Sequence, residues 1–458
     1  MEYGVLSIIP LAVLCVMVFT TKRVLLSLLA ATLAGAILLS GLSFGETWLG
    51  LVQEAFMAGN IGFLILLLGL FGVLIGQLET TGAAMEFAHW LGKFANTRKK
   101  ALFITYLLGI CIFIDEYLNC MIISTSMKRV TDKFRIPRSF LGYVVNSTGS
   151  PVSIIVPVSA WAIFYAGLYE SEGIVVNGSG MGTYIAAIPY MFFGWITLII
   201  MCLVVLGVLP MIGISAKHRR LAEETGILAS TEVALDGKAI MAQEMDEQEE
   251  SQIKAAPWSF LITLATIVTV TIVSGLNVMV GAMAAIAALS VISLLRKKVR
   301  LSQLLDGSCK GVTDMSTVCI LIVLACTLVT ANEKLGLSGF VVGTLAPYLS
   351  GALLPAAVFG FCAIYACLGG GFWDMTMVFF PMVIPLASAV GADPVLAGAA
   401  LVCSAAMGSA TYVGGDCVNI VSRGLDIKPV YVTLATLPYS AVSYVITIVC
   451  FAAAGLIG

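Results

Sequence analysis

Two adjacent carboxylates, Asp115 and Glu116, stand between two apolar stretches of the chain. The stretches Ala101–Phe113 and Cys120–Ser126 are each too short to cross a bilayer, which needs about 20 apolar residues. A short apolar arm, a polar tip and a second short arm predict a re-entrant hairpin, whose charge is tolerated only inside protein or beside a water-filled cavity. A carboxylate there costs about 2.5–3.5 kcal/mol, so the pair is a candidate functional site. The alternative is a solvated loop between two distorted spans.

The composition indicates a membrane protein with several spans. The chain has 458 residues, of which 60% are hydrophobic and only 11% are charged, whereas soluble domains carry about 25% charged residues. The net charge of −2 gives no reason to expect a nucleic-acid partner. The 12 cysteines lie mostly in apolar stretches without a CxxC motif, so we interpret them as core residues and predict no transition-metal site.

The order of the predicted elements repeats once along the chain. Five spans are expected in each half, near 4–20, 24–41, 60–78, 139–165 and 186–209, then near 257–275, 278–295, 314–332, 395–422 and 429–455. Each half also holds an amphipathic piece, 82–94 or 336–349, followed by a hairpin, 101–127 or 352–390. The fourth span of each half is predicted to be broken, at Asn146–Pro151 and near Gly408–Ser409, where small and polar residues interrupt the apolar pattern.

The two halves also match in register. Glu79 and Gly82 correspond to Glu333 and Gly336 at an offset of 254 residues. Three more pairs share an offset of 257 residues: Pro137 with Pro394, Ser147 with Ser404, and Ser159 with Asp416. We therefore predict a first repeat over residues 1–213, a cytoplasmic linker over 214–256 and a second repeat over 257–458.

Charge supports opposite orientations of the repeats. Five spans per half is an odd number, so the second repeat must be inverted relative to the first. With the N-terminus outside, 23 of the 24 lysines and arginines fall on the inside, and only Lys334 lies outside. This distribution follows the positive-inside rule. The fold class is thus an all-α polytopic membrane protein with about ten transmembrane helices in two inverted repeats.

Inverted repeats with broken helices are typical of secondary transporters, whose sites lie near the middle of the bilayer. Half-helix starts attract anions there, and half-helix ends coordinate cations. Candidate ion- or proton-binding residues are Asp115, Glu116, Asn119, Asp374 and Asp416. Candidate substrate-binding residues are Asn146, Ser147, Thr148, Ser150, Trp373, Thr376, Ser409 and Thr411. Oxygen donors suit hard cations such as Na⁺, and a buried carboxylate that binds either Na⁺ or H⁺ provides a basis for exchange.

Each candidate has a structural alternative. Any single serine or threonine can instead serve close helix packing or bond to its own helix. Asp416 can lie past its break and face the cytoplasmic cavity. Trp90, Trp161 and Trp373 are also candidates for anchors at the membrane interface.

Enzymes and channels fit the sequence less well. The only histidines, His89 and His218, fall in predicted cytoplasmic segments, so no Ser-His or HExxH constellation can form in the core. We predict no enzymatic activity, and no cofactor other than Na⁺ or H⁺ as coupling ions. A channel would not need two interrupted hairpins.

Four runs of the first half resemble the NhaC family of Na⁺/H⁺ antiporters: Ile114–Asn119, Met127–Ile136, Asn146–Val152 and Val156–Trp161. The resemblance implies an elevator-type carrier, usually dimeric, with Asp115 and Glu116 as its paired acidic motif. The second half departs from the family pattern. Ser409 and Ala410 replace an aspartate and a histidine, and the tip reads Gly371-Phe372-Trp373-Asp374-Met375-Thr376.

The sequence therefore predicts a cation-coupled secondary transporter in a bacterial-type inner membrane. Na⁺/H⁺ exchange is the first hypothesis, because the family resemblance implies it. The alternative is Na⁺-coupled transport of a small organic solute, such as an amino acid or a carboxylate, because the second half has lost polar family residues. The expected partners are the ion or solute, the lipid bilayer and a second copy in a homodimer.

Overall fold

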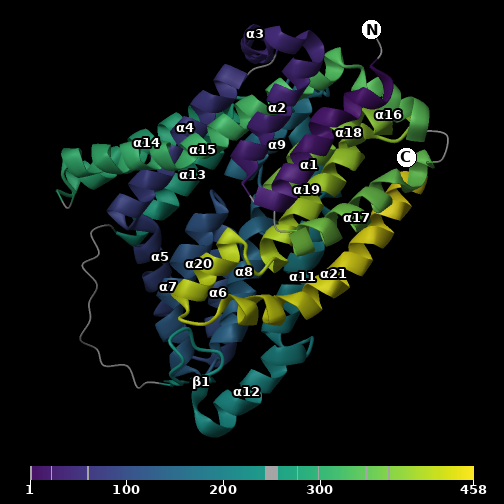
Figure 1. The fold of residues 1–458 in the computed structure, drawn as a ribbon. Coiled ribbons are helices and arrows are strands. Elements are labelled where there is room, and N and C mark those ends of the chain that lie inside the picture. Colours follow the sequence, from purple (N-terminus) through teal and green to yellow (C-terminus); the bar gives the residue numbers. More distant parts are fainter. Residues whose placement is uncertain are drawn as a thin grey trace.

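The computed structural model describes the chain except residues 1–2, 22, 59–60, 243–255, 276, 298, 346–348, 370–371 and 458. It is an all-α membrane protein, as predicted (Figure 1). The first half contains α1 (Ile9–Thr21), α2 (Val24–Ser40), α3 (Phe44–Ala58), α4 (Ile61–Thr81), α5 (Ala83–Gly92), α6 (Arg98–Cys111), α7 (Glu116–Lys133), α8 (Arg138–Ile155), α9 (Ala160–Ser171), α10 (Gly180–Ala187) and α11 (Phe192–Leu206). The segment between the halves contains α12 (Gly213–Thr225), β1 (Ile227–Ala229) and β2 (Ile240–Met241). The second half contains α13 (Pro257–Val273), α14 (Val278–Leu295), α15 (Leu301–Lys334), α16 (Leu337–Leu345), α17 (Leu354–Gly369), α18 (Phe372–Ala389), α19 (Pro394–Thr411), α20 (Asp416–Gly424) and α21 (Pro429–Ile457).

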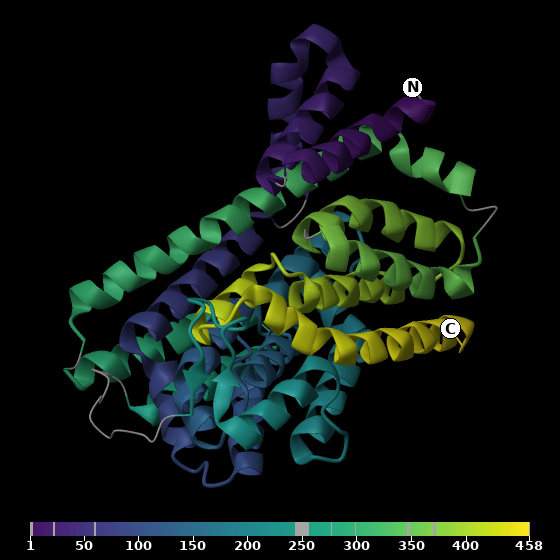
Figure 2. The same cartoon turned by 60° about the horizontal axis from the view of Figure 1, so that its bottom comes forward.

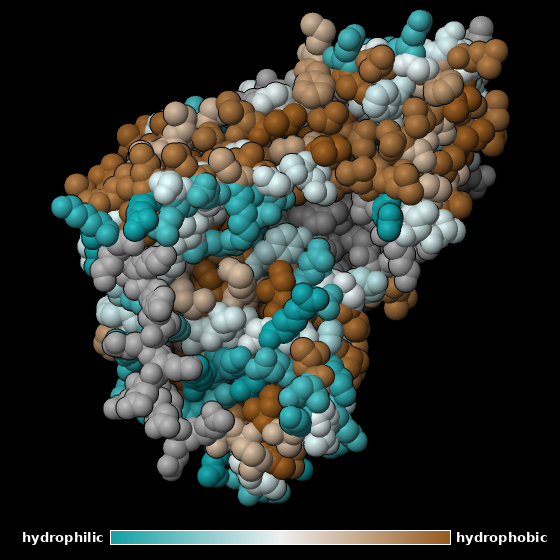
Figure 3. All heavy atoms as spheres, turned by 60° about the vertical axis from the view of Figure 1, so that its left-hand side comes forward, coloured by the Kyte–Doolittle hydropathy of each residue, from teal (hydrophilic) through white to brown (hydrophobic). Residues whose placement is uncertain are grey.

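The number of spans agrees with the prediction. Within the described residues, six helices are long and apolar enough to cross a membrane, and three bent pairs raise the number to nine. One of the nine, α17, is an arm of the second hairpin. The shorter helices α1 and α13 occupy the first predicted span of each half, which gives about ten spans. On the side of α13 to α15, side chains such as Leu261, Met283 and Ile320 form a broad apolar surface that suits contact with lipid (Figure 3).

The second half repeats the elements of the first. Helices α4 and α5 correspond to α15 and α16, and in both pairs a glycine with positive φ separates the helices: Gly82 at 65° and Gly336 at 72°. Glycine adopts this left-handed conformation without steric cost. The broken pair α8–α9 corresponds to α19–α20, and α8 and α19 both have 18 residues. Their starts, 138 and 394, differ by 256 residues, one fewer than the predicted offset of 257.

The predicted positions of the helix breaks were wrong. Helix α8 continues through Asn146–Pro151 and ends at Ile155. Val156, the next residue, is extended with φ −92° and ψ 122°, because it precedes Pro157 and the proline ring disfavours the helical region. Helix α19 likewise runs past Gly408 and Ser409, and the chain becomes extended at Tyr412. Both breaks thus lie several residues after the polar positions that suggested them.

Two segments outside the predicted spans form ordered elements. Helix α3 lies between the predicted spans 24–41 and 60–78, where no element was predicted, and Figure 2 shows it projecting from the bundle at the N-terminal end. The described part of the predicted linker, up to residue 242, packs against the bundle instead of lying in solvent. Val233 and Ala234 are buried, and Ala234 bridges to Ile427 in the loop before α21. Glu223 of α12 forms an ion pair of 2.6 Å with Arg98 at the start of α6.

Glycines hold the two long helices α4 and α15 together. Gly72 and Gly76 of α4 face Gly307 and Gly311 of α15, so each helix contributes two glycines four residues apart. A Cβ atom on Gly76 would overlap the carbonyl group of Gly307, and one on Gly311 would overlap that of Gly72. Such glycine pairs allow membrane helices to approach at backbone distance.

Candidate functional site

Asp115 lies at the tip of the first hairpin and caps α7. Its side chain is 4% exposed, and its Oδ1 accepts a hydrogen bond of 2.9 Å from the Leu118 amide. Its backbone is extended (φ −149°, ψ 141°), as is typical of the residue before a helix. The carboxylate therefore lies at the positive end of the α7 dipole, which favours negative charge.

Glu116, the first residue of α7, joins the two halves of the chain. Its side chain is 1% exposed, and its Oε2 accepts a hydrogen bond of 3.0 Å from Ser409 Oγ of α19. The Trp161 indole of α9 and the Cys417 thiol of α20 lie beside the same carboxylate. Gly149 of α8 packs against the same turn of α7, since a Cβ atom there would lie 3.2 Å from Cys120 Sγ and 3.7 Å from Glu116 Cβ. The carboxylate is thus surrounded by α8, α9, α19 and α20.

Helices α8 and α19 cross beside Glu116 through polar side chains. Asn146 Nδ2 donates to the Ala410 carbonyl, and Ser150 Oγ donates to the Ala406 carbonyl at 3.0 Å. Both donors come from the first repeat and both acceptors from the second. The predicted residues Asn146, Ser150 and Ser409 are therefore brought together, all of them within helices, with Ser409 in the last turn of α19.

Two buried oxygen atoms beside this crossing lack hydrogen-bond partners within the described chain, Glu116 Oε1 and Asn146 Oδ1, and Ser147 Oγ of α8 is a third unpaired atom on the same helix as Asn146. Pro151 leaves the Ser147 carbonyl without its usual helical donor, because proline has no N–H. Buried polar atoms are almost always paired, so unpaired ones need an explanation. Carboxylate, amide and hydroxyl oxygens are the ligands that hard cations prefer.

Other predicted residues serve the fold. Asn119 Nδ2 donates to the carbonyls of Gly109 at 2.7 Å and Ile112 at 2.8 Å, which ties the two arms of the hairpin together. Thr148 Oγ1 bonds to the Val145 carbonyl of its own helix at 2.9 Å. Thr411 Oγ1 does the same with Met407 at 2.6 Å. The Thr376 hydroxyl is 3.0 Å from Tyr165 Oη.

Asp416, another acidic candidate, does not join the buried cluster. Asp416 is exposed at the start of α20, where Tyr117 Oη reaches its Oδ2 at 3.5 Å. This position agrees with the alternative of a residue past its break. Trp373 and Asp374 lie in the first turn of α18, but their side chains are outside the described part of the structure.

Small residues of α19 serve close packing. A Cβ atom on Gly408 would overlap the Ala366 side chain of α17, and Ala405 and Ala406 are completely buried. The space that these small side chains leave beside α19 is therefore filled by the neighbouring helix α17.

Two residues of the site were not predicted, Trp161 and Cys417. Trp161 was interpreted as an interfacial anchor, but it is 1% exposed and lies beside Glu116. Its position four residues after Pro157, at the start of the helix that follows the break, was the available signal. Cys417 is one residue after the predicted Asp416, on the buried face of α20.

Comparison with known proteins supports the fold. No family model matches the chain, so membership of the NhaC family is not shown. An uncharacterised protein of Haemophilus influenzae is 24% identical over 96% of this chain and 88% of its own length. The structure resembles the YdaH transporter of Alcanivorax borkumensis, with a TM-score of 0.64 and 12% identity over 97% of this chain and 98% of the other. It also resembles MtrF of Neisseria gonorrhoeae, described among a class of antimetabolite efflux pumps, with a TM-score of 0.61 and 12% identity over 97% and 94%.

Proposed function

We propose that this protein is a secondary active transporter in which Glu116 exchanges Na⁺ and H⁺. The observation that carries the proposal is the buried carboxylate with an unpaired Oε1, beside the crossing of α8 and α19, where Asn146 Oδ1 is also unpaired. The fold shared with YdaH and MtrF supports membrane transport. The resemblance of the first-half motifs to Na⁺/H⁺ antiporters supports the choice of ions.

The charge balance of Glu116 gives the physical reason. No described lysine or arginine forms an ion pair with this carboxylate, and its polar neighbours Ser409, Cys417 and Trp161 are all uncharged. An isolated charge in a buried site is costly, so it is neutralised by a proton or paired with a cation. A single group with these two states can bind Na⁺ from one side and release it when H⁺ binds. Asp115 at the α7 N-terminus adds a second negative charge that attracts either cation.

The test is transport by the purified chain in proteoliposomes. A Na⁺ gradient should drive H⁺ movement, read with a pH-sensitive dye inside the vesicles, and Glu116→Gln should abolish it. Glu54→Gln is the matched control, because Glu54 is an exposed carboxylate paired with Lys334 on the surface. Equal H⁺ movement in the wild type and Glu116→Gln would contradict the proposal.

A second candidate is Na⁺-coupled transport of a small organic solute. It is favoured by the fold shared with MtrF, whose description is that of an antimetabolite efflux pump. Radiolabelled amino acids and carboxylates in the same vesicles distinguish the two. Uptake or efflux of a solute that requires Na⁺ would select this candidate, while Na⁺-driven H⁺ flux without any solute supports the antiporter.

The remaining parts of the proposal concern the oligomeric state, the transport movement, the membrane and the boundaries of the repeats. A homodimer, an elevator-type movement and a bacterial-type inner membrane follow from the family resemblance. The repeat boundaries 1–213 and 257–458, with the segment between them in the cytoplasm, follow from the sequence.

A further inference from the structure

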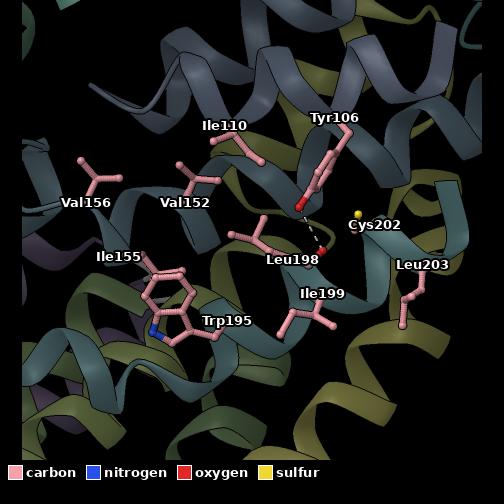
Figure 4. A pocket seen from close by; sticks show the side chains of 10 residues that line it. All are labelled: Tyr106, Ile110, Val152, Ile155, Val156, Trp195, Leu198, Ile199, Cys202 and Leu203. Carbon is pink, nitrogen blue, oxygen red and sulfur yellow. Dashed lines mark hydrogen bonds between the residues drawn. The ribbon is translucent and has the colours of Figure 1, made fainter. Parts of the chain in front are cut away.

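An apolar cavity of about 410 Å³ lies between α6, α8 and α11, behind the helix crossing (Figure 4). Tyr106 and Ile110 of α6 form one wall, Val152 and Ile155 of α8 a second, and Trp195 and Ile199 of α11 a third. Its size falls within the range of about 300–1,000 Å³ that is common for ligand pockets. No function assigned above uses it.

The cavity opens toward the bilayer. Trp195 and Ile199 are 41% and 58% exposed, and they belong to the bent pair α10–α11, which is long and apolar enough to span a membrane. The Tyr106 hydroxyl donates to the Leu198 carbonyl at 3.3 Å, so only its ring is offered to a ligand. Organic-ligand pockets usually hold a few polar groups that fix orientation. A cavity with walls of this kind instead suits a hydrocarbon chain.

Lys99 lies beyond one end of the cavity, and Lys100 follows it on α6. Helix α6 begins with Arg98, Lys99 and Lys100, and Lys99 Nζ is 3.9 Å from where a Cβ on Gly207 would lie. Gly207 follows α11 four residues after Leu203, which lines the cavity. Arg98 is paired with Glu223, whereas Lys99 and Lys100 are exposed and form no ion pair within the described chain. Positive side chains beside the hydrocarbon region attract anionic lipid head groups.

We propose that this cavity binds an acyl chain of an anionic glycerophospholipid, with its phosphate group held by Lys99 and Lys100. The wall formed by Val152 and Ile155 is the last turn of α8 before the break, one turn after Asn146–Pro151. A bound acyl chain therefore packs against helix α8, just before its break, from the lipid side. The lipid stabilises this position of the break independently of the solute that the protein transports.

The test is native mass spectrometry of the full chain in detergent, with added phosphatidylglycerol or phosphatidylcholine. The wild type should retain one phosphatidylglycerol in preference to phosphatidylcholine. Ile199→Trp places an indole at the cavity and should weaken retention about tenfold. Ile320→Trp is the matched control: Ile320 is an isoleucine of α15, is 47% exposed and does not line the cavity, so retention should be unchanged.

The lysines provide a second variant that leaves the packing intact. Lys99→Gln and Lys100→Gln should each weaken binding of phosphatidylglycerol about fivefold. They should weaken binding of phosphatidylcholine less, because its choline group offsets the charge of the phosphate. Lys133→Gln, at an exposed lysine of α7, should have no effect. Equal retention of the two lipids by the wild type, or equal retention by the wild type and Ile199→Trp, would overturn the proposal. A dimer that dissociates in Ile199→Trp without loss of lipid would assign the cavity to a second copy of the chain.

Discussion

Ser409 donates a hydrogen bond to Glu116 across 3.0 Å, although 293 positions separate the two residues in the chain. One partner comes from the hairpin of the first repeat and the other from the broken helix of the second. The buried carboxylate is therefore not a property of either repeat alone. A change in the relative position of the repeats would alter the environment of Glu116 directly.

The first prediction separates the charge of Asp115 from its role as a helix cap. Asparagine caps helices as well as aspartate does, so Asp115→Asn should fold with little loss of stability and lose most cation-coupled transport. Asp115→Ala should lose about 1 kcal/mol of stability in addition, measured by thermal unfolding in detergent. Wild-type transport by Asp115→Asn would show that Asp115 acts only as a cap.

The second prediction concerns the coupling between Ser409 and Glu116. A hydrogen bond to a charged group contributes about 1.5–3 kcal/mol, so Ser409→Ala should destabilise the wild type but have a smaller effect in Glu116→Gln. A double-mutant cycle of unfolding free energies measures the difference. Ser404→Ala is the control, because Ser404 bonds at 2.7 Å to the Ala400 carbonyl of its own helix. Its effect should be the same with and without Glu116→Gln.

The third prediction concerns the contact between α4 and α15. Gly76→Ala should destabilise the protein by about 1–3 kcal/mol, because the added Cβ overlaps the Gly307 backbone. Gly69→Ala, on the same helix, meets no atom within 4 Å and should be neutral or slightly stabilising. Thermal unfolding in detergent compares the two. Equal melting temperatures would mean that the helices can separate without cost.

The fourth prediction concerns Arg138, which holds together parts of both repeats. Its guanidinium group lies 2.8 Å from Asp132 of α7 and 2.9 Å from Asp426 before α21. Arg138→Ala leaves Asp132 buried without its partner and should cost about 3–5 kcal/mol. Arg219→Ala, which removes an exposed pair with Glu223, should cost less than about 0.5 kcal/mol. Similar losses for the two variants would mean that the Arg138 cluster is as well solvated as the surface pair.

The fifth prediction concerns pH. His218 of α12 is 7% exposed and shares a hydrogen bond of 2.8 Å with Ser139 of α8. Burial lowers the pKa of His218 below its ordinary value of 6.5, and the nearby Lys217 lowers it further. The unfolded chain then binds more protons than the folded chain in this range, so stability decreases as the pH falls below about 6.5.

The measurement is the melting temperature between about pH 8 and pH 5. The wild type should lose more stability over this range than His218→Asn, which keeps a hydrogen-bonding side chain but does not titrate. Parallel curves for the two proteins would show that His218 is protonated equally in both states.

The sequence predicted a sheltered carboxylate pair at the hairpin tip but not the residues that pack around it. Glu116 could be found because a carboxylate flanked by apolar residues is costly in a membrane, and Gly82 and Gly336 could be matched because both end a long helix. The break after α8 was placed too early, because Pro151 is accommodated inside a helix that only Pro157 ends. The packing of Trp161 and Cys417 against Glu116 depends on contacts between distant segments, which no local pattern contains. The order of the α12 segment was missed for the same reason.

The glycine contact between α4 and α15 also has a consequence in time. Gly72 and Gly311 are 239 residues apart, so α4 enters the membrane long before its partner exists. At a synthesis rate of about 5–20 residues per second, about 10–50 s pass between the synthesis of Gly72 and that of Gly311. During that interval, the bare backbone of Gly72 and Gly76 is open to any other helix nearby. The nascent first half therefore has to be kept apart from its neighbours until the ribosome has completed most of the chain.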